Sequence, residues 1–343
     1  MTKKKLFSVI AILTLVLVVA GCSSTSDDSL TTSNDGELAL SLADAPVNNV
    51  ESVYVTFKEV QVHNTDEDEW QVVNDFSDEA DGEKKFDLLK LRFSEALLGQ
   101  KELPTGSYDQ IRLIVAATEN GKGNGPDSGK SYVEFKDGST TNLFIPSGVQ
   151  TGLKIPHEFT IEEGVITHLI ADISVKEIMH SAGKSGKIIL NPTQAIDIIP
   201  TIVSGNVTGR VFADVDGDGV FDEDEDGSLD EVLTDPNYDV TVEAYQGGEL
   251  VKSTVTTIED LDTDDDGTID KKAGSYLLRG LEQGDYTIKA KVMTENSNEE
   301  MVEVLNSNDE PLYELEAAQD VTVEAKKDVT VDLKLNKNTV TAQ

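Results

Sequence analysis

Short extended segments recur along most of this chain of 343 residues, and they limit the folds that it can adopt. Within each segment apolar and polar residues tend to alternate, as in ELALSL, YDQIRLIV and YTIKAKV, and Gly, Pro, Asn or Asp ends the segment. A period of two places the apolar side chains on one face of a strand, and a second sheet must cover that face. The pattern predicts an all-β fold built from β-sandwiches.

The strand pattern changes near residue 203, and we expect two β-sandwich domains in tandem, of immunoglobulin-like or prealbumin-like type. The first spans residues 37–202 and the second spans residues 204–343. The chain is long enough for each domain to bury a core of its own.

Apolar parity predicts two local features of the first domain. The apolar residues within 53–57 stand at odd-numbered positions, whereas those within 60–62 stand at even-numbered positions. A single strand can keep both sets on one face only if it contains an extra residue, so a β-bulge is expected near Lys58 and Glu59. A brief helical turn is expected over residues 92–99, where RFSEALLG breaks the alternation.

Two strands should show the alternation most clearly. We expect Ile111, Leu113 and Val115 to face a core, with Arg112 on the other side of the sheet. The apolar residues of 286–292 alternate with two lysines, which is typical of a strand with one solvated face.

The N-terminus has the layout of an export signal. Three lysines at 3–5 precede an apolar run that is too short to span a membrane, and small residues lead to Cys22. Val19-Ala20-Gly21-Cys22 resembles a bacterial lipobox, which implies removal of residues 1–21 and a diacylglyceryl group on the Cys22 sulfur. An ordinary secretory signal that happens to end near a cysteine is the alternative.

Cys22 is the only cysteine, so no disulfide can form within the chain, and lipid attachment explains a single thiol at this place. Residues 22–36 are rich in Ser, Thr, Asp and Asn, and we expect them to be a flexible lipidated tether. The predicted location is the outer face of the cell envelope, on the outer membrane if the cell has two membranes.

The chain is strongly acidic, with 65 Asp and Glu against 28 Lys and Arg, and its formal net charge is −37. Removing residues 1–21, which hold three lysines and no acids, takes this charge to −40. Such a surface repels polyanions, so nucleic acid is excluded as a partner.

Residues 214–225, DVDGDGVFDEDE, fit the spacing of a calcium loop, in which oxygens come from positions 1, 3, 5, 7, 9 and 12 and a glycine stands at position 6. The five carboxylates would repel one another unless a cation lay among them. We expect calcium here, and a solvated acidic turn is the alternative. The six ligand positions hold Asp214, Asp216, Asp218, the Val220 carbonyl, Asp222 and Glu225.

A second acidic stretch, DLDTDDDGTID at residues 260–270, repeats the beginning of the pattern and predicts a weaker calcium site. Position 12 is Ala273, so the bidentate glutamate is missing and a ligand would have to come from elsewhere in the fold. The ligand positions here are Asp262, Asp264, Asp266, the Thr268 carbonyl and Asp270.

The segments on either side of the first loop, GNVTGRVFA and YDVTVEAY, have the composition of strands and no helical apolar stripe. A helix-opening calcium switch therefore does not fit. We expect calcium to hold strand connections together.

The first half of the chain resembles a bacterial lipoprotein domain of unknown function, of the family 4382 type, over residues 36–200. The resemblance implies a surface-exposed β domain and brings no catalytic residues with it. Ala171-Asp172-Ile173 departs from the Asp-Phe-Asp-like strand more frequent in members, which puts a role for that strand in doubt. The segments that carry the resemblance are LADAP (42–46), VYVTFKEVQV (53–62), DLLKL (87–91), LPTGSYDQIRL (103–113), IPSGVQTGLKI (145–155) and ILNPTQAIDI (189–198).

The second half resembles the B-type repeats of serine-aspartate surface adhesins and, more broadly, carboxypeptidase-regulatory-like sandwiches. GRVFADVDGDGVFDEDEDG (209–227) and GSYLLRGLEQGDYTI (274–288) carry this likeness. The family implies a calcium-binding first loop. Some relatives form an isopeptide bond from a lysine in the first strand, but Arg210 stands there, so no such bond is expected.

Motifs of catalysis are scarce. The four histidines have no zinc spacing, and GKGNGPDSGKS (121–131) lacks the first glycine of a phosphate loop, so it is interpreted as a hairpin loop. His168 and Asp172 share a strand face, where a satisfied surface pair is a better interpretation than a catalytic dyad. Trp70, the only tryptophan, could stack on a sugar, although filling a sandwich core is commoner for such a residue.

These features favour a non-enzymatic cell-surface lipoprotein with a calcium-stabilised β-sandwich, for adhesion or extracellular binding. Its expected partners are the membrane, through the lipid, and an extracellular protein or polysaccharide, and a monomer is expected. A polysaccharide-binding module of the envelope is the alternative. An uncharacterised hydrolase, which would need convergent polar groups in a pocket, fits less well.

Overall fold

The alternating segments form strands in the computed structural model, which describes residues 35–45, 50–116, 130–144, 151–175, 177, 188–189, 195–214, 237–264, 266–297 and 300–338. These residues form strands β1 to β22 and one 3-10 turn, η1, and they belong to one compact unit, Asn34–Gln343. The predicted all-β fold class is confirmed.

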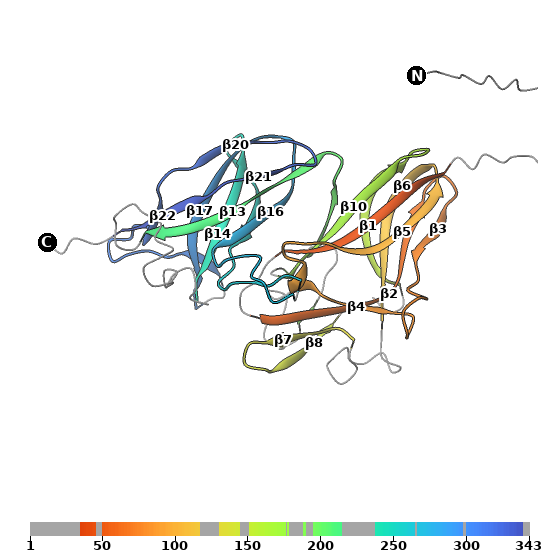
Figure 1. Cartoon of the computed structure of the whole chain (residues 1–343), viewed down its shortest axis with the longest axis horizontal. Helices are drawn as coiled ribbons and strands as arrows, with labels where there is room; N and C mark the ends of the chain where they lie inside the picture. Colours follow the sequence, from red (N-terminus) through yellow and green to blue (C-terminus); the bar gives the residue numbers. More distant parts are fainter. Residues whose placement is uncertain are drawn as a thin grey trace, which may run out of the picture. The chain divides into compact units, whose positions relative to one another are not determined.

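The first group of strands builds two sheets. Its elements are β1 (Asp35–Ala45), β2 (Val50–Asn64), β3 (Glu69–Asn74), β4 (Lys84–Asp87), η1 (Leu88–Leu91), β5 (Ala96–Pro104), β6 (Gly106–Val115), β7 (Tyr132–Phe135), β8 (Thr140–Phe144), β9 (Leu153–Ile161), β10 (Ile166–Ser174), β11 (Ile188–Ile189) and β12 (Ile196–Pro200). One sheet has the order β12-β10-β1-β5, with β1 and β10 parallel (Figure 1). The other has the order β11-β8-β7-β2-β6-β9, and β3 and β4 also pair with β2.

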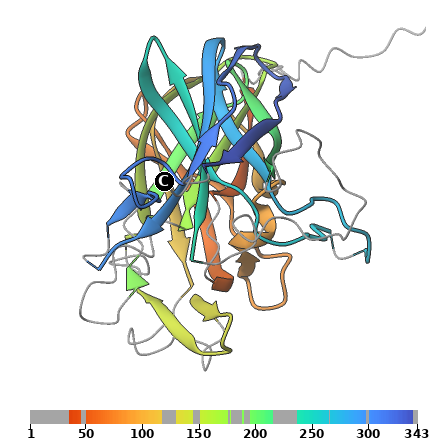
Figure 2. The ribbon, with the colours of Figure 1, turned by 90° about the vertical axis from the view of Figure 1, so that its left-hand side faces the viewer.

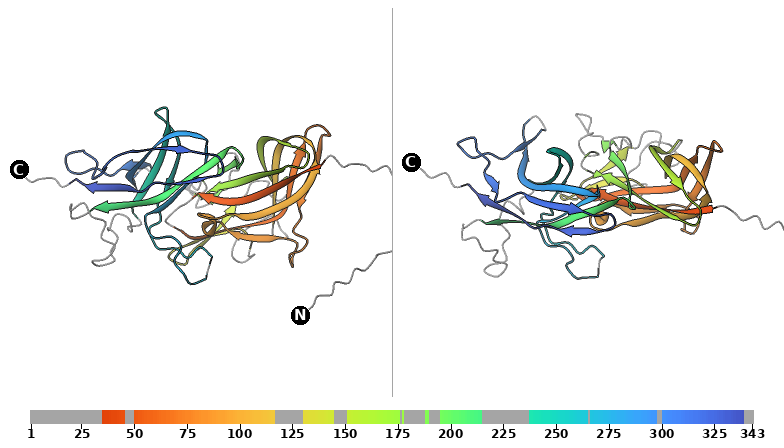
Figure 3. Two further views of the ribbon diagram at one scale, coloured as in Figure 1. Left: turned by 45° about the horizontal axis from the view of Figure 1, so that its top comes forward. Right: turned by 90° about the horizontal axis from the view of Figure 1, so that it is seen from above.

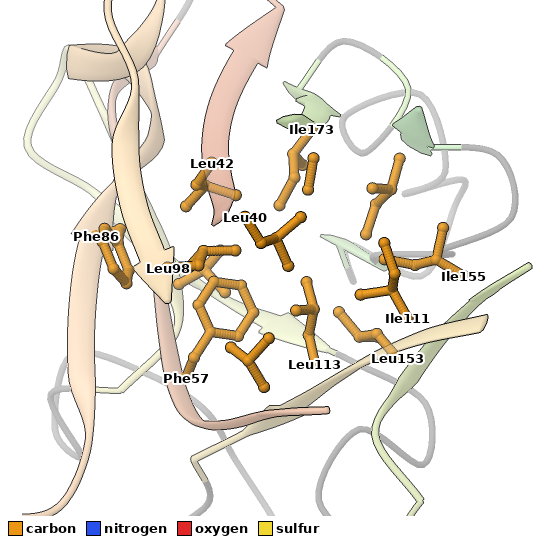
Figure 4. Close-up of a cluster of buried hydrophobic side chains, with 14 of the residues drawn as sticks. Leu40, Leu42, Phe57, Phe86, Leu98, Ile111, Leu113, Leu153, Ile155 and Ile173 are labelled. Atoms are coloured by element: carbon orange, nitrogen blue, oxygen red, sulfur yellow. The ribbon is translucent and has the colours of Figure 1, made fainter. Parts of the chain in front are cut away.

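Alternation along these strands sends one set of side chains into a shared core (Figure 4). Leu40 of β1 and Ile173 of β10 come from the first sheet, and they point towards Phe57, Leu113 and Ile155 of the second. Each of these five side chains is buried, and fully burying such a side chain contributes about 1.5–3 kcal/mol. Burial of this core from both sheets is what defines the sandwich.

The second group of strands builds two further sheets around a second core. Its strands are β13 (Ser204–Asp214), β14 (Asp239–Gln246), β15 (Glu249–Val255), β16 (Ser275–Glu282), β17 (Gly284–Glu295), β18 (Met301–Glu303), β19 (Tyr313–Leu315), β20 (Gln319–Val323), β21 (Asp328–Thr330) and β22 (Leu333–Lys337). One sheet runs β16-β13-β22-β19 with β21 beside β13, and the other runs β15-β14-β17-β18 with β20 beside β17. The predicted domain boundaries at 37–202 and 204–343 stay predictions.

The local features expected from parity are confirmed. The register of β2 on β6 shifts between Phe57 and Glu59, which is the expected bulge. Ile111, Leu113 and Val115 are buried, and Arg112 between them is not. The apolar residues of 286–292 are buried as well, in alternation with less buried lysines.

The helical turn predicted over 92–99 is wrong in position. The turn is η1, which begins where the Asp87 carboxylate accepts a hydrogen bond from the Leu89 amide at 3.3 Å. β5 already starts at Ala96, and it pairs with β1 and buries Leu98 in the core. Pairing and burial therefore override the helix preference of Ala-Leu-Leu.

Two buried arginines connect the two groups of strands. Arg279 of β16 donates hydrogen bonds to the carbonyls of Leu91, the last residue of η1, and of Arg92 and Ser94 just beyond it, at 3.1–3.3 Å. Arg92 in turn donates to the carbonyl of Val255, the last residue of β15, at 2.7 Å. The segment between β15 and β16, which holds the second acidic stretch, therefore starts directly after one of these contacts, at Val255.

Candidate functional site

The lipid site and the first acidic loop cannot be compared with the structure. Cys22, the signal over 1–21 and most of the tether lie outside the described residues. β13 ends at Asp214, whose side chain is not described, and Asp216 to Glu225 also lie outside. Calcium binding by this loop stays a prediction.

The second acidic loop connects β15 to β16 and extends away from the strands (Figures 2 and 3). Leu261 and Lys271 form an antiparallel bridge that closes its base, with the Leu261 amide donating to the Lys271 carbonyl at 2.7 Å. The loop therefore joins two strands, as predicted, and has no flanking helix to reorient within the described residues.

Backbone amides hold the chain of this loop in a tight curve. Gly267 and Asp266 both donate to the Asp262 carboxylate, at 2.8 and 3.2 Å, and Thr263 donates to Asp270 at 2.8 Å. Gly267 stands at position 6 with a φ of 87°, a backbone conformation that favours glycine. The turn that the calcium-loop spacing requires is present.

Three of the five predicted ligands converge. Carboxylate oxygens of Asp262, Asp264 and Asp270, one from each, all lie within 4.8 Å of one another. Asp266 is not part of this cluster, and one of its oxygens accepts a hydrogen bond from the Thr268 amide at 2.7 Å. Three carboxylate oxygens in this arrangement fit a hard divalent cation such as calcium.

The carboxylates of the cluster differ in electrostatic environment although they are exposed. The pKa of Asp264 is raised, first by partial desolvation and then by the negative charge of Asp266. The pKa of Asp270 is lowered, mainly because its carboxylate accepts hydrogen bonds from Thr263. A cation would relieve the repulsion at Asp264, although solvent screens this interaction.

Position 12 of the loop offers no ligand, as the sequence predicted. Ala273 is buried, and its amide donates to the Asp260 carboxylate at 2.9 Å. Lys272 also pairs with Asp260 at 2.9 Å, so this acid is engaged outside the cluster. Within the described residues, no fourth carboxylate joins the three that converge.

Trp70 does not fill the core, although core filling is the commoner role of a tryptophan in a β-sandwich. It lies in β3 opposite His63 of β2, partly exposed, with the two ring centroids 5.1 Å apart. The Arg112 guanidinium stacks 3.7 Å from the centre of the indole, and the Lys154 ammonium is 5.9 Å from it. The sequence placed Arg112 on the outer side of the sheet but gave no sign of Lys154 beside it.

His168 and Asp172 do not form a dyad. The His168 Nε2 atom lies 3.0 Å from the Ser41 hydroxyl and 3.6 Å from a Glu95 oxygen. Asp172 is buried and lies 3.5 Å from the Lys252 ammonium. The two residues have separate partners and Asp172 is buried, so the satisfied surface pair predicted from the sequence is wrong as well. GKGNGPDSGKS lies almost wholly outside the described residues.

A cavity of about 320 Å³, lined by both polar and apolar side chains, lies beside the acidic loop. Asp87, Arg92, Glu259 and Asp262 are among its lining residues, together with the hydroxyl-bearing Ser52, Thr257 and Thr263. Burial raises the pKa of Asp87. None of the described histidines lines the cavity, so no described imidazole is placed there to act as a base for any of these three hydroxyls.

Paired sheets around two apolar cores, with an acidic loop between strands, define an all-β sandwich protein. Residues 35–192 match the family model described as "Domain of unknown function (DUF4382)", which agrees with the resemblance noted in the first half. A comparison with curated proteins found no match. The likeness of the second half to adhesin B-type repeats stays a prediction.

Solved structures with a matching region include the TIE protein of Bacillus anthracis, at 12% identity and a TM-score of 0.21, over 89% of this chain. This chain spans 34% of that protein. The minor pilin GBS52 of Streptococcus agalactiae matches at 12% identity and a TM-score of 0.22, over 89% of this chain and 98% of its own. The shaft pilin SpaA of Lactobacillus rhamnosus GG matches at 8% identity and a TM-score of 0.21, over 90% of this chain and 100% of its own. At these TM-scores the likeness carries no argument about function.

Across the described part of the chain, no helix is both long and apolar enough to cross a bilayer.

Proposed function

We propose that this chain is an exported, non-enzymatic lipoprotein, held on the outer face of the cell envelope by lipid on Cys22. Its acidic loops bind calcium, and its β-sandwiches bind an extracellular protein or polysaccharide. The N-terminal sequence supports export and lipid attachment, since the only cysteine directly follows a lipobox-like Val-Ala-Gly.

The observation that carries the calcium proposal is the convergence of Asp262, Asp264 and Asp270 in a loop whose backbone is already curved by hydrogen bonds. Extracellular calcium modules bind with dissociation constants of about 10⁻⁴–10⁻³ M, so a loop with an incomplete ligand set can still be filled outside the cell. A calcium ion there would fix the connection between β15 and β16. The first loop, over 214–225, has the fuller ligand set and is proposed to bind more tightly.

Calcium titration of the melting temperature tests this proposal. Binding to the folded form alone stabilises it by about 2.7 kcal/mol at a hundredfold excess over the dissociation constant. We expect calcium to raise the melting temperature of the wild type over that in EDTA, and Asp262→Asn to lose part of this rise. Asp216→Asn should lose a larger part.

Glu249→Gln is the matched control, because it removes one exposed negative charge from β15 without touching either loop. Its calcium response should equal that of the wild type. Equal responses in all four proteins, or no calcium response at all, would reject the metal proposal.

A specific observation also favours polysaccharide as the partner. Trp70 lies outside the core on a sheet face with two cations beside it, whereas a tryptophan with a structural role would be expected among the buried residues.

A further inference from the structure

Two positive charges face each other across neighbouring strands. Arg112 of β6 and Lys154 of β9 are register partners, and the residues before and after Lys154 are buried in the core, so both side chains leave the sheet on its outer side. Like charges directly opposite in an antiparallel pair destabilise a sheet. The fold therefore keeps a pairing that reduces its stability.

The chain has 65 acidic residues, and the charge of one of them, Glu59, acts on Arg112 without forming an ion pair with it. Within the described residues, neither Arg112 nor Lys154 has a carboxylate oxygen within ion-pair distance. Asp109 and Asp68 both pair with His63, at 2.8 and 3.3 Å. Two positive charges thus stand together on a molecule whose net charge is −37.

Other side chains fix the position of the Arg112 guanidinium. Its Nε donates to the Gln61 amide oxygen at 2.6 Å, and its plane stacks on Trp70. Gln61 in turn donates a hydrogen bond to the Glu59 carboxylate. Burial lowers the pKa of Arg112, and the negative charge of Glu59 opposes this lowering. A guanidinium held by stacking and by an amide has already lost much of its rotamer entropy before a ligand arrives.

Uncharged groups complete this surface. Gln110 of β6 pairs with His63 on one side and with the exposed Pro156 of β9 on the other, one row along the sheet from Arg112 and Lys154. We define Trp70, Gln110, Arg112, Lys154 and Pro156 as the Trp70 face. It combines a partly exposed indole and proline with an amide and two cations.

We propose that the Trp70 face binds an acidic polysaccharide. A carboxylate of the glycan lies between Arg112 and Lys154, a sugar ring packs against the exposed part of Trp70, and the Gln110 amide bonds a hydroxyl. The inference rests on the extracellular binding role proposed above and names its ligand class. The net charge of −37 repels an acidic polysaccharide as it repels nucleic acid, so binding depends on the local pair of cations and on the indole, and poly(dT) is the comparison that separates the two polyanions.

The test is a calorimetric titration of polygalacturonate into the chain from Cys22 onward, which keeps the whole compact unit. EDTA is present so that calcium cannot bridge protein and polymer, and circular dichroism checks that the chain is folded at the working temperature. Neutral dextran and poly(dT) are titrated in the same way. We expect polygalacturonate to bind, more weakly as salt increases, and the other two polymers not to bind.

Lys154→Gln should weaken this binding by about tenfold, the value of one charged hydrogen bond. Because it also removes the like-charge pair, it should raise the melting temperature slightly. Lys289→Gln is the matched control, since Lys289 is an exposed strand lysine that lies 4.6 Å from the ring of Tyr245. It should change neither binding nor its salt dependence.

The proposal is overturned if polygalacturonate does not bind, if poly(dT) binds as tightly, or if Lys154→Gln binds like the wild type. A lower melting temperature in Lys154→Gln would also overturn it, because Lys154 would then have a structural role on Trp70. The calcium proposal is tested by a different measurement, the rise of the melting temperature with calcium, which Lys154→Gln and Lys289→Gln should leave unchanged. Failure of one proposal can therefore be told from failure of the other.

Discussion

At the scale of single residues, Asp44 of β1 is an acid whose buried environment disfavours the charged carboxylate. It is 2% exposed, and no hydrogen bond to a described residue meets either carboxylate oxygen. Burial, and then the negative charge of Asp172, raise the pKa of Asp44 well above its usual range. The positive charge of Arg92 opposes this rise only in part.

The raised pKa makes stability depend on pH. The folded form holds the Asp44 proton more tightly than the unfolded form does. The stabilisation that this proton gives the folded protein is therefore complete below the pKa of Asp44 in the unfolded chain, and it is lost as pH rises through the pKa of Asp44 in the folded protein. We predict that Asp44→Asn becomes steadily more stable relative to the wild type as pH rises from 4.5 to 8. One proton allows a slope of at most about 1.4 kcal/mol per pH unit.

Urea unfolding across this pH range measures the difference in free energy of unfolding. Asp75→Asn is the control, because Asp75 is exposed and its pKa is lowered by Ser77, so its curve should run parallel to that of the wild type above pH 4.5. Parallel curves for Asp44→Asn and the wild type would show that Asp44 is charged in the folded protein.

At the scale of elements, the short turn η1 depends on a side chain far away in the sequence. Arg279 of β16 donates to three carbonyls at and just beyond the C-terminal end of this turn, and its guanidinium also lies 3.5 Å from Glu95. The C-terminal end of a helical turn carries unpaired carbonyls and partial negative charge, which a buried cation compensates.

We predict that Arg279→Ala lowers the free energy of unfolding by about 3 kcal/mol or more, because buried carbonyls and Glu95 lose their partner. Arg279→Lys should recover part of the loss, since an ammonium cannot reach all three carbonyls. Urea unfolding is the measurement. Lys327→Ala, which removes an exposed pair with Glu324, should cost less than about 1 kcal/mol, and an equal cost for the two alanine variants would contradict this role of Arg279.

Strands and loops differ in how far the sequence predicted them. Strong alternation located most strands and the bulge at Phe57 and Glu59, because parity is a local property. β5 was missed, since ALLGQKELP has no clean alternation and is a strand through its pairing with β1. Spacing located the acidic loop and the missing ligand at Ala273, which are also local.

The Trp70 face could not be predicted in the same way. The pairing of Arg112 with Lys154 depends on the register of β6 on β9, and that register shifts between Tyr108 and Gln110. The stacking of Arg112 on Trp70 further requires β3 and β6 to flank β2 on opposite edges. Such long-range pairing leaves no signature in one sequence.

At the scale of the whole molecule, repulsion among acids opposes the compact state. The formal net charge is −37, and the acids outnumber the basic residues by more than two to one. Exposed charges interact over about 10 Å at 0.1 M salt and about 3 Å at 1 M. Added salt should therefore remove more repulsion from the folded chain than from the expanded unfolded chain.

We predict that sodium chloride raises the melting temperature by several degrees between 0.02 and 0.5 M, with EDTA present throughout. Choline chloride should give nearly the same rise, because screening depends on ionic strength and not on a sodium site. Differential scanning calorimetry of the wild type and Asp262→Asn separates this effect from the calcium site, since both proteins should respond equally to monovalent salt. A melting temperature that stays constant or falls with salt would mean that attractive ion pairs, such as that of Lys252 with Asp172, outweigh the net repulsion.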